Sequence, residues 1–136
     1  MRVKLDNGAI APTRAHTTDA GLDLYAMHDG IVRAGQSATF HTGTHVELPE
    51  NTAGVLLPKS GLMTKHDIIT FGVVDQPYRG EIMVHMFNCG DVDYNVKAGD
   101  KVSQMLVIPV LYECVELVDE LSDSERGAHG FGSSGR

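Results

Sequence analysis

The segment from Ser37 to Leu48 alternates between two kinds of side chain, and this constrains the fold more than any other feature. Its even positions carry apolar residues or threonine, and its odd positions carry polar residues or glycine: Ala38, Phe40, Thr42, Thr44, Val46 and Leu48 against Ser37, Thr39, His41, Gly43, His45 and Glu47. Successive side chains of a strand point to opposite faces, so this period of two predicts a strand with one buried face.

Shorter apolar runs indicate further strands along the chain. They cover residues 54–57, 68–74, 81–87 and 102–110, and residues 114–118 alternate again. Turn-forming pairs such as Asn7-Gly8 and Ala98-Gly99 separate them. Only Ser60 to His66 favours a helix, with Ser60 as a candidate N-cap. Many short strands with so little helix predict an all-β sandwich, jelly roll or barrel.

Length and charge narrow the class of protein. A chain of 136 residues with 42% apolar residues suits one domain with a genuine core. The net charge of -7, without a basic run, argues against binding long nucleic acid. There is no apolar stretch of signal-peptide or transmembrane length, so we expect an intracellular, cytoplasmic protein that does not enter membranes.

Two candidate sites lie between apolar runs. The loop from Asp75 to Glu81 holds an acid, Tyr78 and Arg79. It is either an ordinary polar turn or a platform on which Asp75 acts as a general base and Tyr78 stacks against a sugar or ring. Before the predicted helix, Lys59 adds positive charge to free N–H groups, an arrangement that suits phosphate but equally suits a plain helix start.

Three further features have an ordinary and a functional interpretation. Asp23 interrupts an apolar run, either at an outward-facing strand position or as a Mg²⁺ ligand, direct or through water. Gln104 and Ser103 lie in an apolar strand, where they need hydrogen-bond partners or edge exposure. The glycine-rich tail after Leu121 is either a disordered terminus or a segment whose backbone and Arg126 approach phosphate.

The order of these segments is more specific than any one of them. AGLDLYA (20–26), PKSGL (58–62), GVVDQPYRGE (72–81), GDKVSQ (99–104) and RGAHGFGSSG (126–135) resemble the five ordered motifs of the trimeric dUTPases. The resemblance implies an all-β, dUTPase-like jelly roll with one short helix over residues 1–121. It also implies a flexible C-terminal lid over residues 122–136 that is part of the active site.

The resemblance further implies an activity and an assembly. The enzyme would be a homotrimer with active sites shared between subunits. It would hydrolyse dUTP to dUMP and pyrophosphate by Mg²⁺-assisted attack of water on the α-phosphate. That reaction limits uracil incorporation into DNA and supplies dUMP for dTMP synthesis.

Residue roles carry over position by position. Asp75 matches the acid that activates the water, Tyr78 the ring beneath the sugar, and Asp23 an acid near the metal, acting through bound water. The remaining matches bind substrate: Lys59, Ser60 and Gly61 the phosphates, Gly72, Val73 and Val74 the uracil edge through their main chain, Gln104 the phosphate chain, Arg126 the γ-phosphate, Phe131 the uracil face, and Gly132, Ser133 and Ser134 the lid and phosphate oxygens.

The chain also departs from the family pattern, and two other functions stay open. Lys59 stands where arginine is frequent, which exchanges a bidentate fork for a compact ammonium. Ser134 stands where threonine is usual, and His129 adds bulk to the tail. The alternatives are a dCTP deaminase on the same fold and a regulatory protein that uses this fold to bind a partner.

Overall fold

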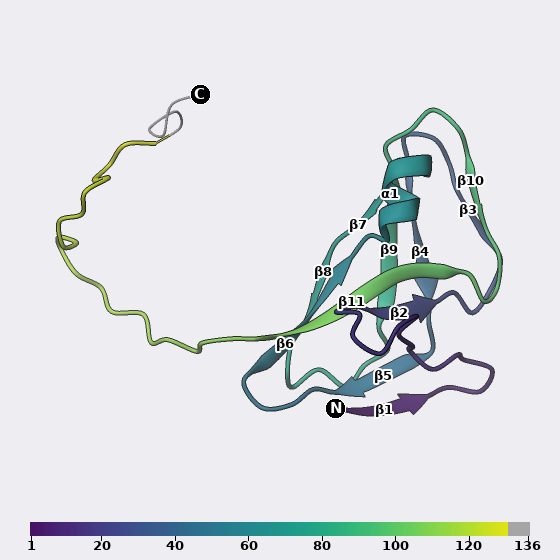
Figure 1. Cartoon of the computed structure of the whole chain (residues 1–136), viewed down its shortest axis with the longest axis horizontal. Helices are drawn as coiled ribbons and strands as arrows, with labels where there is room; N and C mark the ends of the chain where they lie inside the picture. Colours follow the sequence, from purple (N-terminus) through teal and green to yellow (C-terminus); the bar gives the residue numbers. More distant parts are fainter. Residues whose placement is uncertain (131–136) are drawn as a thin grey trace.

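A computed structural model, which describes residues 1–130, folds as an all-β jelly roll with one short helix (Figure 1), as predicted. The elements in this part of the chain are β1 (Arg2–Leu5), β2 (Leu22–Tyr25), β3 (Gly30–Val32), β4 (Ser37–His41), β5 (Thr44–Glu47), β6 (Thr52–Leu57), α1 (Ser60–His66), β7 (Ile68–Thr70), β8 (Gly72–Val74), β9 (Met83–Asn88), β10 (Tyr94–Val96) and β11 (Lys101–Pro109). No helix within residues 1–130 is long and apolar enough to cross a membrane.

Four small antiparallel sheets organise the strands. The largest has the order β2-β11-β6-β8, and a second has the order β4-β9-β7. Two-stranded sheets, β1-β5 and β10-β3, complete the body. One apolar core joins them, with Leu24 and Met105 from the first sheet meeting Phe40 and Met86 from the second. Full burial of such side chains stabilises by about 1.5–3 kcal/mol each.

The alternation from Ser37 to Leu48 gives the buried face that it predicts, but not one strand. Phe40, Thr42, Thr44 and Val46 are all buried. The ladder is interrupted between β4, which pairs with β9, and β5, which pairs with β1. The break occurs because the Thr42 hydroxyl donates to the Ile82 carbonyl and Gly43 adopts a φ of 59°, so the chain changes partner there. Alternation sets the face of a strand and does not set its partner.

A similar break divides the predicted strand 68–74. β7 pairs with β9, whereas β8 pairs with β6, and exposed Phe71 lies between them. The helix spans Ser60 to His66 as predicted, but the N-cap assignment is wrong. Lys59 occupies the N-cap position and makes no side-chain capping bond, which leaves Ser60 inside the first turn.

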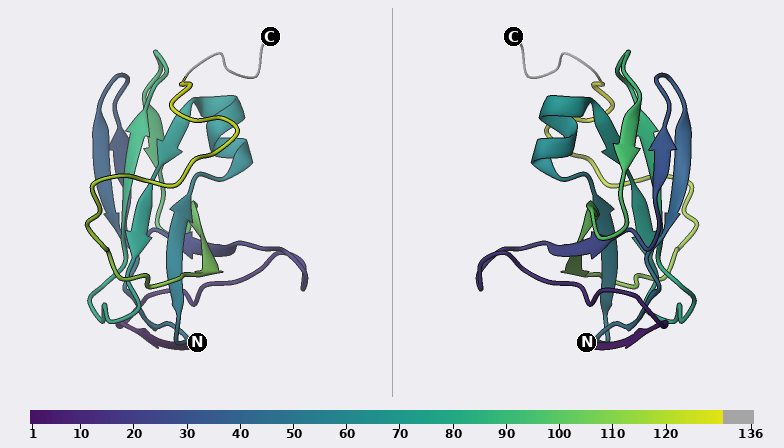
Figure 2. Two further views of the ribbon diagram at one scale, coloured as in Figure 1. Left: turned by 90° about the vertical axis from the view of Figure 1, so that its left-hand side faces the viewer. Right: turned by 90° about the vertical axis from the view of Figure 1, so that its right-hand side faces the viewer.

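The chain leaves the body after β11. Residues 110–130, here called the arm, contain no helix or strand and run away from the sheets (Figures 1 and 2). The strand predicted at 114–118 is therefore wrong for the isolated chain, because a strand needs a neighbour to complete its ladder. Four apolar side chains of the arm are almost fully exposed: Leu111, Val115, Leu117 and Leu121.

Candidate active site

The loop between β8 and β9, residues 75–81, carries the predicted base. Asp75 follows directly after β8, and its backbone carbonyl accepts a 3.0 Å hydrogen bond from the Tyr78 N–H, which closes a turn. Arg79 donates from Nη1 to the carbonyls of Gln76 at 2.6 Å and Tyr78 at 2.9 Å. The loop is thus internally bonded, and Asp75 itself is exposed at its start.

The loop is also tied to the body. The Gln76 amide oxygen accepts a bond from the Asn51 N–H at 3.0 Å. The Glu81 carboxylate accepts bonds from the Gly43 N–H at 2.8 Å and from His41 Nδ1 at 2.7 Å. Burial opposes ionisation of Glu81, but the His41 and Gly43 bonds outweigh it and lower the pKa of this carboxyl group. Both ends of the loop are therefore held in place.

Tyr78 turns back over its own loop. Its hydroxyl donates to the Glu81 carbonyl at 3.0 Å, and its ring occupies the space that a Cβ at Gly80 would need. Any larger residue at Gly80 would displace the ring. Tyr78 is 43% exposed, so one side of the ring remains free to meet a ligand.

A cleft of about 370 Å³ adjoins this loop. Its lining includes the predicted base and ring together with the backbone of β8: Gly72, Val73, Val74, Asp75, Tyr78 and Glu81, with Phe71, Ile82, Met83, His85 and Leu56 around them. β8 is the edge strand of its sheet, because β6 is its neighbour on one side and no other described strand pairs with it. The outer N–H and C=O groups of β8 are therefore available to a ligand.

Asp23 lies in a second cluster, and it is buried rather than outward-facing. Its side chain is 5% exposed, and its Oδ1 accepts a bond from the Lys59 ammonium. Its Oδ2 lies 2.7 Å from the Lys101 ammonium. Burial opposes ionisation of Asp23, but bonds from Lys101 and Lys59 outweigh it and lower the pKa of Asp23. The Asp23 side chain lies inside because its carboxylate contacts Lys59 at the start of α1 and Lys101 on β11.

Gln104 sits beside this cluster, opposite Asp23 in the β2–β11 ladder. Its amide nitrogen donates to the Pro58 carbonyl at 3.0 Å, and Ser103 donates to the Leu57 carbonyl at 2.9 Å. The expectation that these polar groups need partners is confirmed. Gly21 leaves room for this side chain, since a Cβ there would overlap the Gln104 amide oxygen and displace it.

A second cleft, of about 280 Å³, opens beside α1. Half of its six lining residues are lysines, Lys59, Lys65 and Lys101, and the others are Gly61, Leu62 and His66. Such a surface suits the phosphates of a nucleotide. Ser60, in the first turn of α1, is exposed next to it.

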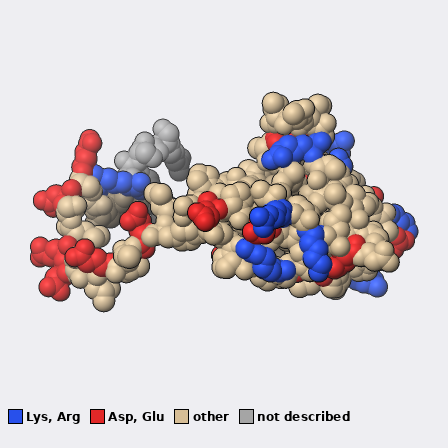
Figure 3. Space-filling model, turned by 90° about the horizontal axis from the view of Figure 1, so that it is seen from below, with Lys and Arg blue, Asp and Glu red and all other residues tan. Residues whose placement is uncertain are grey.

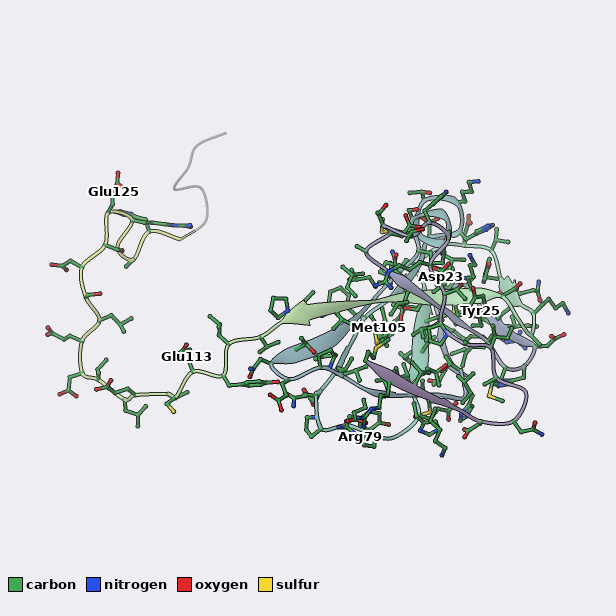
Figure 4. All side chains as sticks on the ribbon, turned by 60° about the horizontal axis from the view of Figure 1, so that its bottom comes forward. Asp23, Tyr25, Arg79, Met105, Glu113 and Glu125 are labelled. Atoms are coloured by element: carbon green, nitrogen blue, oxygen red, sulfur yellow. The ribbon has the colours of Figure 1, made fainter. Side chains whose placement is uncertain are left out.

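The two clefts share no lining residue, and they lie on different parts of the body. In Figures 1 and 2, α1 lies at the end of the body opposite the loop between β8 and β9. Figure 4 likewise separates Asp23 from Arg79, and it places Glu125 far out on the arm. Arg126 follows Glu125 and bonds to the carbonyls of His129 at 2.9 Å and Gly130 at 3.1 Å. The candidates Phe131, Gly132, Ser133 and Ser134 lie outside the described residues.

Three residues of these clusters were not predicted from the sequence. Lys101 pairs with Asp23, Glu81 anchors the base-bearing loop, and Gly80 makes room for Tyr78. A signal existed for Glu81 and Gly80, since both directly follow Tyr78-Arg79 in the same loop. Lys101 lies in the GDKVSQ motif (99–104), but its contact with Asp23 could not be predicted, because that contact depends on the β2–β11 register.

Known proteins share this arrangement of segments. A model of the dUTPase family matches residues 7–135. The chain belongs to the dUTPase family. The deoxyuridine 5'-triphosphate nucleotidohydrolase of Clostridium acetobutylicum is 44% identical over 135 residues, covering 97% of this chain and 93% of that protein. The family assignment does not favour the deaminase alternative.

Solved dUTPase structures agree with the fold over nearly the whole chain. The dUTPase of Staphylococcus bacteriophage 80alpha with dUPNHPP has a TM-score of 0.89 at 27% identity, covering 99% of this chain and 98% of that one. A mutant dUTPase from phage phi11 of S. aureus has a TM-score of 0.81 at 24% identity, covering 88% and 96%. The latter structure concerns coordination of a structural Mg(II) ion.

Proposed function

We propose that this member of the dUTPase family hydrolyses dUTP to dUMP and pyrophosphate, with Asp75 as the general base. The observation that carries the proposal is the braced loop after β8, which presents Asp75 and Tyr78 to one cleft. Asp75 accepts a proton from a water molecule while the oxygen of that water bonds to the α-phosphorus. The bond from that phosphorus to the bridging oxygen of the β-phosphate breaks, and pyrophosphate leaves.

Selection for deoxyuridine is assigned to the same cleft. The free backbone edge of β8, at Gly72, Val73 and Val74, offers fixed donors and acceptors to the uracil edge. The exposed side of the Tyr78 ring lies beneath the sugar, where it leaves no room for a 2′-hydroxyl group. Because Glu81 and Gly80 fix the position of this ring, the exclusion is steric and does not depend on an induced change.

Phosphate binding is assigned to the cationic cleft and to the tail. Lys59, Ser60 and Gly61 at the start of α1 meet the phosphate chain, and Gln104 supports it. Residues 122–136 form a lid in which Arg126 binds the γ-phosphate. In that lid Phe131 covers the uracil, Gly132 lets the backbone approach, and Ser133 and Ser134 reach phosphate oxygens.

Magnesium accompanies the triphosphate in this proposal. Both oxygens of buried Asp23 already contact ammonium groups, so the residues present do not favour direct ligation by Asp23. A contact with the ion through a water molecule fits them better. When bound, the ion neutralises phosphate charge. The chain's own part is to keep Lys59 aligned beside the phosphates, through Asp23.

We also propose that three copies share their active sites. Neither cleft of one chain holds both the Asp75 loop and the cationic cluster, which supports a nucleotide that lies between copies and contacts both. The arm supports the same arrangement, since it carries exposed leucines away from its own body. Docking on a neighbouring subunit would bury them and bring Arg126 to that subunit's site.

The test is a four-nucleotide assay with Mg²⁺, in which dUTP, UTP, dCTP and dTTP are followed for pyrophosphate and nucleoside monophosphate. We expect rapid release from dUTP and poor turnover of the other three. Equal rates on dUTP and UTP would contradict the role of Tyr78. Ammonia release from dCTP would favour the deaminase alternative, and binding of dUTP without turnover would favour a regulatory protein.

A further inference from the structure

His45 on β5 links the N-terminal segment to the base-bearing loop. Its Nε2 lies 3.2 Å from Oδ2 of Asp6, the residue after β1. Its Nδ1 lies 3.0 Å from the Arg79 carbonyl oxygen, within the loop that holds Asp75 and Tyr78. The side chain is 18% exposed, so its ring is largely enclosed between these two partners.

The two partners determine the protonation state of the ring. A carbonyl oxygen and a carboxylate oxygen both accept hydrogen bonds and donate none. Each ring nitrogen of His45 must therefore carry a proton if both bonds form. Neutral imidazole has one N–H, so it satisfies only one partner, and the imidazolium ion satisfies both.

The surroundings of His45 carry both signs of charge. The bond to Arg79 and the bond to Asp6 raise the pKa of His45 above its ordinary value, and nearby Lys4 opposes them. A pocket of about 210 Å³ beside the ring is lined by Arg2, Lys4, Glu47 and Arg79. Arg2 is paired with Glu47 at 3.0 Å, which removes part of the opposing positive charge.

We propose that His45, as an imidazolium ion held by Asp6, is a positioning residue that fixes the Arg79 carbonyl and thereby the loop presenting Asp75 and Tyr78. The carbonyl it holds lies next to Tyr78 in sequence and next to Gly80, whose missing side chain accommodates the Tyr78 ring. The Arg79 guanidinium binds the Gln76 and Tyr78 carbonyls within the loop, whereas His45 binds the loop from β5. This inference rests on the proposed function only for its kinetic consequence.

Protonation gives the support a pH dependence of defined sign. A raised pKa in the folded state means that the protonated ring stabilises the fold at and below pH of about 6.5, the ordinary value for histidine. The stabilisation is lost as pH rises through the folded pKa. Above it one of the two bonds breaks, so His45 no longer joins Asp6 to the loop, which then depends on its bonds to Asn51, Gly43 and His41.

The first test is NMR titration of the ring nitrogens of His45 in the whole protein, which needs no turnover. We expect the ring to be mostly protonated at both nitrogens at pH 6.5, and we expect Asp6→Asn to lower the pKa of His45 while Asp6→Glu restores it. A wild-type His45 that is neutral at pH 6.5 or titrates below it would overturn the proposal. The NMR titration remains decisive even if the chain fails to hydrolyse dUTP. Failure to hydrolyse dUTP would refute the proposed function alone.

The second test compares His45→Gln with His16→Gln. His16 is a matched control, because it too lies 3.2 Å from an aspartate, Asp19, but at an exposed surface. We expect wild-type kcat to decline at alkaline pH as His45 loses its proton. We expect His45→Gln to abolish that decline, to lower kcat for dUTP by about tenfold and to reduce the preference for dUTP over UTP. The control should leave all three unchanged.

Melting temperatures separate positioning from a structural role. If His45→Gln lowers the melting temperature but leaves kcat, the dUTP preference and the pH profile of kcat unchanged, His45 merely stabilises the fold and the proposal fails. If kcat and nucleotide preference change while Asp6→Glu keeps them near wild type and Asp6→Asn does not, the positioning role is supported.

Discussion

The body and the arm differ in the exposure of their leucine side chains. Leu24 on β2 is 0% exposed, whereas Leu117 on the arm is 94% exposed. The body buries Leu24 in one apolar core that its sheets share. The arm carries its apolar residues beyond any partner within the described chain, together with a dense set of acidic side chains visible at the left of Figure 3.

The same contrast applies to the proposed active site. Its loop from Asp75 to Glu81 is formed within one chain, whereas its arm needs a neighbouring subunit. The loop from Asp75 to Glu81 is fixed by bonds to Asn51, Gly43 and His45, so its geometry exists in one chain. Arg126 bonds only to carbonyls of its own tail among the described residues. Changes in the body should therefore affect chemistry or folding, and changes in the arm should affect activity through assembly and closure.

The largest expected effect comes from the body, at Asp75. Asp75→Asn should lower kcat for dUTP by about a thousandfold, because an amide cannot accept the proton of the attacking water. Binding of a non-hydrolysable dUTP analogue, measured by calorimetry, should persist, since the loop bonds at Asp75 use its backbone. Asp29→Asn, at an exposed ion pair with Lys97, serves as the control. Full activity of the Asp75 variant would refute the base assignment.

The next largest effect comes from the arm. Deletion of residues 126–136 should lower kcat/KM by about a hundredfold, the loss typical when groups that stabilise a transition state are removed. The melting temperature and the sedimentation coefficient of the assembly should stay near wild type, because residues 126–130, the described part of the deleted segment, lie outside the core. An unfolded product would contradict the separation of body and arm, and a fully active one would contradict the lid.

The same division explains which features could be predicted from sequence. Local signals succeeded: the alternation at 37–48 gave the buried face, and α1 has the predicted bounds. The pairing of strands distant in sequence was not predicted. A pattern of period two does not indicate that β4 pairs with β9 or that β5 pairs with β1. The strand predicted at 114–118 failed because its ladder cannot be completed inside one chain.

Site residues follow the same rule. The motifs identified Asp75, Tyr78 and Lys59, whose neighbours in sequence are also part of their sites. The motif at 99–104 contains Lys101 but did not predict its role, because only the β2–β11 register brings its ammonium to Asp23. The motifs also predicted nothing about His45, whose partners Asp6 and Arg79 lie far from it in the sequence.

A matched pair of leucines tests the contrast between body and arm directly. Leu24→Ala should lower the free energy of unfolding by about 2–5 kcal/mol, since it leaves a cavity in the core. Leu117→Asp should leave the fold of the body intact and weaken the trimer, because it charges a side chain that we expect to dock on a neighbour. Chemical denaturation and sedimentation at several concentrations measure the two effects. A trimer of unchanged stability with Leu117→Asp would mean that the arm stays exposed in the assembly.

The smallest expected effect concerns buried charge in the body, at Asp23. Asp23→Asn should lower the free energy of unfolding at neutral pH by about 1–3 kcal/mol, less than for a fully buried pair, because Lys59 and Lys101 are partly exposed. A lowered pKa means that the contribution of Asp23 is present above pH of about 4 and is lost as pH falls through the folded value. Acid denaturation should consequently be less steep in the Asp23→Asn variant. Glu116→Gln on the exposed arm is the matched control. An equal change in the free energy of unfolding of both variants would show that the ion pairs of Asp23 do not stabilise the body.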